Sequence, residues 1–142
     1  MAEIIYEDNH IIAVYKRSSD LAQGDKTGDV SLDTEIKKYI AEKYKKTGEV
    51  FLGVVHRLDR PVSGVILSAR TSQAPERLND MFREKQIKKT YLAIVNDRPP
   101  EDEATVTHCT KQTETQNKRN VFETEGQGSK AASSTHRRRG RA

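Results

Sequence analysis

The sequence predicts an α+β fold, in which a mixed, largely antiparallel sheet carries two helices. Short runs rich in β-branched and aromatic residues recur along the first 95 positions. Two intervening stretches instead repeat apolar residues at helical spacing. Turn-forming residues separate these segments, as expected for short connected elements. At 142 residues the chain has the length of one ordinary domain.

The first two strands are predicted at residues 4–6 and 11–15. The polar residues 7–10 between them are typical of a turn, so the pair should form a β-hairpin. Residues 16–30 are polar and contain glycines, which predicts a loop. The glycine spacing matches neither a phosphate-binding loop nor a dinucleotide fingerprint, so binding of a nucleotide cofactor is rejected.

Each predicted helix follows a serine that could act as an N-cap, Ser31 for the first and Ser72 for the second. Gly48 is expected to end the first helix. Pro75 is compatible with the first turn of the second helix, where its missing N–H removes little. The apolar stripes that define the two helices are Leu32, Ile36, Tyr39, Ile40 and Ala41, then Ala74, Leu78, Met81 and Phe82.

Three further strands are predicted at residues 51–55, 64–69 and 90–95. The last has apolar residues on both faces, as expected for an inner strand. Beyond it only residues 105–109 and 120–122 are strand candidates. Of the 47 positions from Asn96 onward, 8 are apolar, too few to build a separate core.

The positive net charge of +4 comes from the end of the chain. The last 14 residues hold five basic groups and no acid, so residues 1–128 carry 20 basic against 21 acidic groups, a net charge of −1. We therefore expect a folded portion over residues 1–125 and a basic, disordered tail over residues 126–142. Such a tail attracts polyanions without sequence preference.

Several classes of protein are excluded by composition. A single cysteine, Cys109, rules out an internal disulfide framework and a cysteine-rich metal site. The N-terminus lacks the basic and apolar regions of a signal peptide. The longest apolar run is about five residues, far below the length of a membrane span. A soluble, cytoplasmic protein without membrane association is expected.

The candidate site lies between the strands at residues 51–55 and 64–69. Asp59 is the only acid beside three residues that can be positively charged, His56, Arg57 and Arg60. Nearby cations keep a carboxylate ionised, and an ionised carboxylate can act as a nucleophile or base. A solvated turn with weak surface ion pairs explains the same charge pattern.

Two motifs resemble the RluA-type pseudouridine synthases, a family of RNA uridine isomerases. The first is His56-Arg57-Leu58-Asp59-Arg60-Pro61-Val62-Ser63-Gly64, followed by Val65-Ile66-Leu67. The second is Ile87-Lys88-Lys89-Thr90-Tyr91-Leu92-Ala93-Ile94-Val95. The resemblance covers about residues 4–125, and pseudouridine synthases share the sheet predicted above.

The resemblance implies a role for each candidate residue. Asp59 corresponds to the catalytic aspartate and Tyr91 to the active-site tyrosine, which offers a flat ring and a hydroxyl. Arg57 is expected to enter the RNA stack or hold its backbone. The reaction breaks and remakes a bond to uracil without redox change, so no cofactor or metal is expected. The further RNA-contact candidates are His56, Arg60, Lys88 and Lys89.

The chain departs from the family pattern after Phe122. The family has a later strand resembling Thr-Gly-Arg-x-His-x-Ile-Arg, and this pattern is absent here. We therefore expect a truncated or diverged member, with strand edges open to self-association. Ribosomal RNA is the first expected substrate and transfer RNA the second, on family habit. The alternatives are a non-catalytic RNA-binding module and a glycoside-cleaving enzyme, which needs a second positioned acid.

Overall fold

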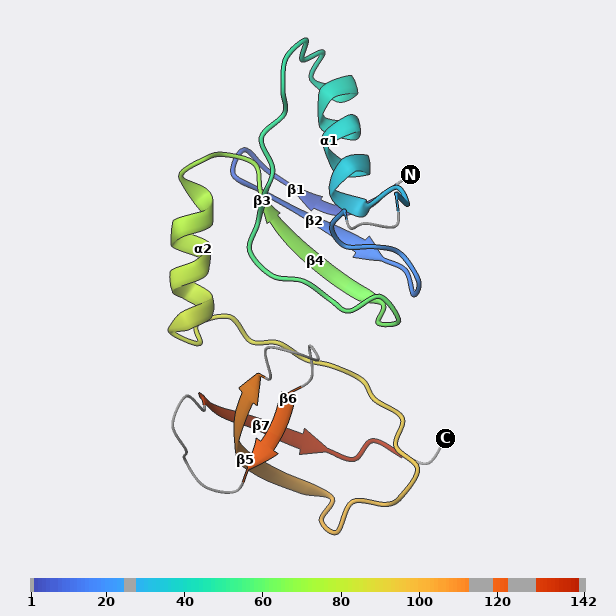
Figure 1. Ribbon diagram of the computed structural model, residues 1–142, viewed down its shortest axis with the longest axis vertical. Helices are drawn as coiled ribbons and strands as arrows, with labels where there is room; N and C mark the ends of the chain where they lie inside the picture. Colours follow the sequence, from blue (N-terminus) through green and yellow to red (C-terminus); the bar gives the residue numbers. More distant parts are fainter. Residues whose placement is uncertain (1, 25–27, 113–118, 123–129, 141–142) are drawn as a thin grey trace. The chain divides into compact units, whose positions relative to one another are not determined.

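The computed structural model describes residues 2–24, 28–112, 119–122 and 130–140. The chain divides into two compact units, Met1–Lys89 and Thr90–Ala142. The first unit holds both helices and a four-stranded sheet, and the second holds a three-stranded sheet (Figure 1). All described strand pairs are antiparallel. The α+β prediction is confirmed, with two antiparallel sheets in place of one mixed sheet.

The sheet of the first unit has the strand order β1-β2-β4-β3. Its first two strands form the predicted hairpin, and β3 is shorter than the predicted strand at residues 51–55. The elements of this unit are β1 (Glu3–Glu7), β2 (Ile11–Lys16), α1 (Leu32–Lys43), β3 (Gly53–Val54), β4 (Gly64–Ala69) and α2 (Ala74–Arg83).

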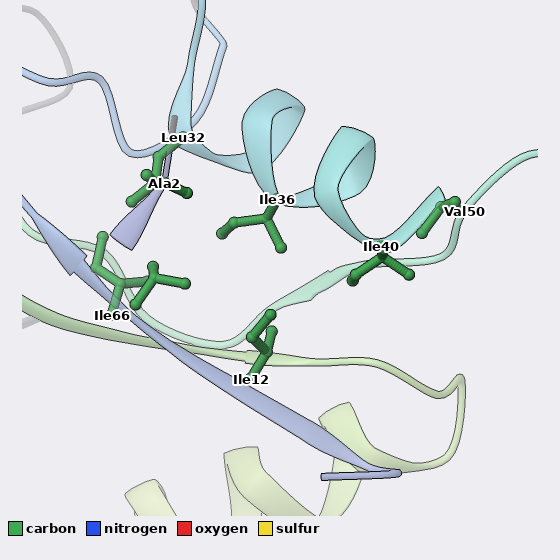
Figure 2. Close-up of a cluster of buried hydrophobic side chains, with 8 residues drawn as sticks. Ala2, Ile12, Leu32, Ile36, Ile40, Val50 and Ile66 are labelled. Atoms are coloured by element: carbon green, nitrogen blue, oxygen red, sulfur yellow. The ribbon is translucent and has the colours of Figure 1, made fainter. Parts of the chain in front are cut away.

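The main core forms between α1 and one face of this sheet (Figure 2). Successive strand residues point to opposite faces, so alternate positions of β2 and β4 share this side. The core side chains are all nearly inaccessible to solvent, and burying each Val, Leu or Ile among them stabilises the fold by about 1.5–3 kcal/mol. They are Ile12, Val14 and Ile66 from the sheet and Leu32, Ile36 and Ile40 from α1, with Ala2 and Val50 at the margins.

The second helix packs on the opposite face. Ala74 and Leu78 of α2 form a smaller buried cluster with Ala69 of β4, joined by Ile11 and Leu67. The close approach depends on Gly53 in β3, where an added Cβ would lie 2.6 Å from Pro75 Cγ. The sheet is therefore covered by a helix on each face, and each helix packs one of the two buried clusters against the strands.

The predicted ends of both helices need correction. The Ser31 hydroxyl does not cap a backbone N–H, because it donates to the nearby carboxylate of Asp33. The helix α1 ends at Lys43, before Gly48, since Lys45 takes a left-handed conformation (φ 49°). The second helix starts at Ala74 after Gln73, so Ser72 is not its N-cap.

The predicted inner strand at residues 90–95 is wrong. This segment contains no strand, and its side chains are exposed. An inner strand needs hydrogen-bonded neighbours on both edges, and no described strand pairs with this segment. The apolar alternation is present in the sequence, but in the described structure nothing pairs with these residues or covers them.

The second unit is a sheet with the order β6-β5-β7, formed by β5 (Glu103–Gln112), β6 (Arg119–Phe122) and β7 (Lys130–Arg137). The strand candidates at residues 105–109 and 120–122 are confirmed. The prediction of a disordered tail is wrong for residues 130–137, which pair with β5; residues 126–129 and 141–142 lie outside the described ranges. Cys109 is the one described apolar side chain that is buried in this unit, in agreement with the scarcity of apolar residues.

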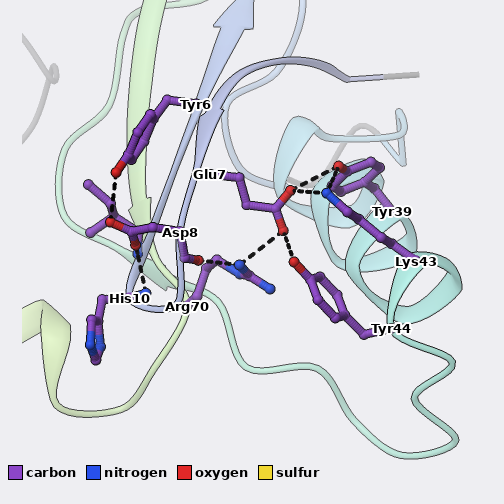
Figure 3. A network of polar contacts seen from close by, with 9 residues as sticks. Tyr6, Glu7, Asp8, His10, Tyr39, Lys43, Tyr44 and Arg70 are labelled. Carbon is purple, nitrogen blue, oxygen red and sulfur yellow. Dashed lines mark hydrogen bonds and ion pairs between the residues drawn. The ribbon is translucent and has the colours of Figure 1, made fainter.

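Glu7 joins β1, α1 and β4 through a network of polar contacts (Figure 3). Its carboxylate accepts hydrogen bonds from Lys43 Nζ (2.7 Å), Tyr44 OH (2.7 Å) and Tyr39 OH (2.9 Å), and it pairs with Arg70 at 2.9 Å. Burial alone would raise the pKa of Glu7, but these donors outweigh it and lower the pKa from 4.5 to about 2. The network ties the helix to the sheet edge.

Replacing Glu7 by Gln should lower the free energy of unfolding at pH 7 by about 2 kcal/mol, because Arg70 and Lys43 lose their anion. Folding lowers the pKa of Glu7, so its contribution is complete above pH 4.5 and is lost as the pH falls toward 2. Urea titrations between pH 7 and pH 2 should show a smaller acid dependence for Glu7→Gln. The exposed Glu49→Gln serves as the control, and equal acid slopes for wild type and Glu7→Gln would contradict the prediction.

Substituting Gly53 by Ala should lower the free energy of unfolding by about 1–3 kcal/mol, since the new Cβ collides with the Pro75 ring. Gly48→Ala is the matched control, because an added Cβ there meets nothing within 4 Å. Urea unfolding midpoints compare the two. The double variant Gly53→Ala/Pro75→Ala should recover most of the loss, and failure to do so would place the cost elsewhere.

Candidate active site

The candidate site is built on the Asp59 loop, residues 55–63, which joins β3 to β4. Its side chains alternate: His56 and Leu58 are partly buried, whereas Arg57 and Asp59 are exposed. Leu58 packs against the main core. The loop therefore attaches to the protein through one set of side chains and presents the other set to solvent.

The His56 side chain pairs with a backbone N–H of β4 just beyond the end of β3. Its Nε2 accepts a hydrogen bond from the backbone N–H of Leu67 at 2.9 Å, a donor that a longer β3 would have paired. The ring also packs against Phe82, with 5.1 Å between ring centroids. Burial lowers the pKa of His56, and the positive charge of Lys89 lowers it further. The neutral ring that results is the form that can accept the Leu67 N–H.

Lys16 holds the other side of the loop. Its side chain is fully buried at the end of β2, with 0% of its surface exposed. The ammonium donates to the backbone carbonyls of Val62 (2.7 Å), Arg60 (2.9 Å) and Arg17 (3.1 Å). These three acceptors use all three ammonium protons, which is what a buried lysine requires. Two distant segments, the end of β2 and the Asp59 loop, are thereby joined.

Arg60 and its neighbours make further contacts, which join the Asp59 loop to Ser18, Ser19 and Asp29. The Arg60 guanidinium pairs with Asp29 (2.9 Å) and donates to the Ser19 carbonyl (3.1 Å). In return Ser19 N–H donates to the Arg60 carbonyl (2.9 Å), and the Ser18 hydroxyl to the Pro61 carbonyl (3.0 Å). The structure thus engages Arg60 in internal contacts.

Gly64 sets the exit of the loop into β4. Its φ of 150° lies in a region that residues with a Cβ rarely adopt, and an added Cβ would lie 3.3 Å from Leu58 Cδ1. Gly64 also pairs with Lys16 in the sheet register. A glycine here lets the chain turn into β4 directly above the lysine that holds the loop.

The Asp59 carboxylate is exposed while its backbone carbonyl closes a turn with Val62 N–H (3.0 Å). Burial lowers the pKa of Lys16, and the negative charges of Asp20 and Asp59 oppose this effect. No ion pair joins Asp59 to Arg57 among the described contacts, so Arg57 remains open to solvent.

The remaining predicted site residues lie outside this loop. Lys88 and Lys89 are exposed after α2, with Lys89 Nζ 5.9 Å from the centroid of the Phe82 ring. Tyr91 is exposed and belongs to the second unit, so Asp59 and Tyr91 fall in different units. The structure brings His56, Arg57, Asp59 and Arg60 together on one loop.

Two arginines of the basic tail are engaged within the second unit. Arg138 binds the Asp102 carboxylate at 2.6 and 3.0 Å, and this pairing lowers the pKa of Asp102 to about 2. Arg137 pairs with Glu103 at 3.0 Å. Two of the five basic groups that the sequence places at the end of the chain are therefore paired with acids at and just before the start of β5.

Within the part of the chain that the structure describes, no group of three or more His, Cys, Asp or Glu side chains could hold a metal ion. No described helix is long and apolar enough to cross a membrane.

Comparison with known proteins identifies the same family as the sequence motif of the Asp59 loop. The family described as RNA pseudouridylate synthase matches residues 10–141. The chain belongs to this family. The match includes the Asp59 loop, the segment with Tyr91 and the three strands of the second unit.

Individual relatives are longer than this chain and resemble it over part of their length. It is 35% identical over 103 residues to the ribosomal large subunit pseudouridine synthase C of Rickettsia bellii, covering 72% of this chain and 32% of the relative. It is 38% identical over 95 residues to the tRNA pseudouridine synthase C of Yersinia pestis, covering 67% and 35%. The chain thus spans about a third of the length of these curated relatives.

Solved structures agree on the fold. Human RNA pseudouridylate synthase domain containing 4 superposes with a TM-score of 0.75 at 17% identity, covering 95% of this chain and 52% of that one. Human RNA pseudouridylate synthase domain containing 1 gives a TM-score of 0.68 at 19% identity, covering 95% and 51%.

Sequence reasoning missed Lys16. The polar composition of residues 16–30 assigns it to a loop, yet it is the last residue of β2 and is fully buried. The signal was present in the alternation: Ile12 and Val14 face α1, and the next residue on that face is Lys16. A lysine on the same face of a strand as buried isoleucine and valine residues indicates an ammonium group that is buried and held by internal hydrogen bonds.

Replacing Lys16 by Met should loosen the Asp59 loop with little effect on the core. Met fills similar volume, but Val62 and Arg60 lose a shared charged donor. Hydrogen exchange at the Val62 amide should quicken at least about tenfold, while amides in the centre of β2 keep their protection. Lys38→Met, on the exposed surface of α1, is the control. Unchanged exchange at Val62 would show that Lys16 does not hold the loop.

Proposed function

We propose that the chain forms the part of an RNA pseudouridine synthase that carries the catalytic aspartate, with Asp59 as nucleophile toward a flipped uridine. The reaction breaks the bond between C1′ of ribose and N1 of uracil and rejoins uracil through C5, with no gain or loss of atoms or electrons. The observation that carries the proposal is the Asp59 loop, whose backbone is held by Lys16 at the carbonyls of Arg60 and Val62 and which leaves the Asp59 side chain exposed. A fixed, accessible carboxylate is what nucleophilic catalysis requires.

The other candidate residues take supporting roles in this proposal. Arg57, exposed beside Asp59, holds the RNA stack or backbone next to the flipped nucleotide. Lys88 and Lys89 contact phosphates, and Tyr91 stacks on the uracil or exchanges protons with it. His56 and Arg60 reach RNA only at their outer edges, since both make internal contacts. The reaction needs no cofactor.

Ribosomal RNA is the proposed substrate, with transfer RNA second. The support is that relatives from several Rickettsia species are named ribosomal large subunit pseudouridine synthase C, while others are named tRNA pseudouridine synthase C. We place this activity in the cytoplasm, in keeping with the single, unpaired Cys109.

A non-catalytic RNA-binding module is the second candidate. One observation favours it: Tyr91 is exposed outside any strand. In this alternative, binding depends on Arg57 and the two lysines, and the carboxylate of Asp59 does not react.

The substitution Asp59→Asn separates the two candidates. An enzyme should lose isomerisation by at least about a thousandfold, because an amide cannot act as the nucleophile. RNA affinity should change less than about threefold, since Asp59 is not a phosphate ligand. The assay incubates the chain with ribosomal RNA and detects pseudouridine as reverse-transcription stops after carbodiimide treatment. Asp80→Asn on α2 is the control. Binding without product in the wild type would support the second candidate.

A further inference from the structure

His56 is the residue of the Asp59 loop whose side chain contacts both β4 and α2. Its Nε2 accepts the backbone N–H of Leu67 in β4 at 2.9 Å, and its ring packs against Phe82 of α2, with 5.1 Å between ring centroids. Its neighbours Arg57 and Asp59 on the same loop are exposed to solvent. The half-buried imidazole therefore attaches the exposed part of the loop to two elements of the first unit.

Asp59 lies between two attachments of its loop. After it in the chain, the carbonyls of Arg60 and Val62 accept hydrogen bonds from Lys16 at 2.9 and 2.7 Å. Before it, His56 provides the attachment to β4 and α2. A reacting group has to be held close to its productive geometry, because a displacement of about 1 Å can lower the rate about a hundredfold. Loss of the His56 attachment should therefore displace Asp59 without altering its carboxyl group.

The hydrogen bond from Leu67 requires a neutral imidazole. A neutral ring carries one N–H and one nitrogen lone pair, and the lone pair on Nε2 faces the Leu67 N–H, so the proton is assigned to Nδ1. Protonation would add an N–H at Nε2, and two donors would then face each other. The attachment of the loop to β4 is thus tied to the protonation state of His56.

The surroundings of His56 favour the neutral ring. It faces a backbone N–H of β4, the uncharged Phe82 ring of α2 and, from the segment after α2, the positive charge of Lys89. Burial lowers the pKa of His56 from its ordinary value of 6.5, and the charge of Lys89 lowers it further. Since folding lowers this pKa, the stability that the neutral ring contributes is complete above pH 6.5 and is lost as the pH falls below that value.

We propose that His56 is the positioning residue for Asp59: its neutral imidazole holds the loop on β4 and α2, and its protonation releases the loop and slows isomerisation. The inference rests on the proposed function of Asp59. It gives His56 a role inside the protein, through Leu67 and Phe82, in addition to any contact with RNA. His56 exchanges no proton with the uridine in this proposal.

The first test compares two substitutions that separate the acceptor from the titration. His56→Leu removes the acceptor and keeps an apolar side chain, whereas His56→Gln keeps an acceptor oxygen and does not titrate. Amide hydrogen exchange is measured at Leu67 and Val62 from about pH 8 to about pH 4, with each rate divided by the intrinsic rate at that pH. The wild type should lose protection at both amides at least about tenfold as His56 is protonated. His56→Leu should show this loss throughout the range, and His56→Gln should show it nowhere.

Three controls assign the titration to His56. His10→Leu changes an exposed histidine in the turn between β1 and β2 and should leave the pH profile of both amides unchanged. Asp59→Asn should also keep the wild-type profile, which excludes the Asp59 carboxyl as the titrating group. Lys89→Gln should move the transition to higher pH, because a positive charge that opposes protonation of His56 is removed. Circular dichroism at each pH checks that every protein keeps its fold.

The second test measures isomerisation of ribosomal RNA over the same pH range. His56→Leu should lower kcat about tenfold to a hundredfold at neutral pH and change KM less than about threefold, because Asp59 is displaced while the proposed RNA contacts remain. His56→Gln should restore most of this loss. Its kcat should also begin to fall at a lower pH than that of the wild type, since the titrating ring is gone.

The proposal would be overturned by a wild type whose Leu67 amide keeps the same protection across the pH range. A His56→Gln variant that exchanges as fast as His56→Leu would also overturn it, and so would equal kcat values in all three proteins. If His56→Leu does not fold, the comparison of wild type with His56→Gln decides. Expected exchange without product at any pH would reject the proposed function of Asp59 and would still support His56 as the residue that holds the loop.

Discussion

The ammonium group of Lys16 lies at the end of β2, beneath the loop that carries Asp59, and donates to three backbone carbonyls. Burying an unpaired charge costs several kcal/mol, so an ammonium at 0% exposure persists only when every proton has an acceptor. The chain meets this condition by folding residues 60–62 over the lysine. The same contacts that satisfy Lys16 therefore determine where the Asp59 loop lies.

Other contacts follow from this constraint. With residues 60–62 held, Leu58 reaches the main core and His56 completes the sheet by accepting the Leu67 N–H. The chain then needs Gly64, whose backbone conformation suits few other residues, to turn back into β4. Arg57 and Asp59 face solvent because their neighbours face inward. The alternation of inward-facing and outward-facing side chains along this loop thus anchors the loop and leaves the candidate nucleophile, Asp59, exposed.

The two units differ in how they are held together. The first has helices on both faces of its sheet and a carboxylate, Glu7, that ties α1 to the sheet edge. The second relies on backbone pairing, hydroxyl contacts such as Thr105 with Thr135 (2.8 Å), and the ion pairs of Arg137 and Arg138. Those two arginines are neutralised locally. Any attraction of the second unit to RNA is therefore weaker than its sequence charge suggests.

Local sequence by itself determined most elements of the first unit and the composition of the candidate loop, because hydrophobic alternation and turn residues act over a few positions. The hairpin, both helices and the strands at residues 53–54 and 64–69 follow from such patterns. The family motif likewise singled out Asp59 and its neighbours. Tertiary structure decided what depends on partners far along the chain. Lys16 became a structural residue through carbonyls 44 and 46 positions away, residues 130–137 became a strand by pairing with β5, and residues 90–95 lack strand structure where no described strand pairs with them.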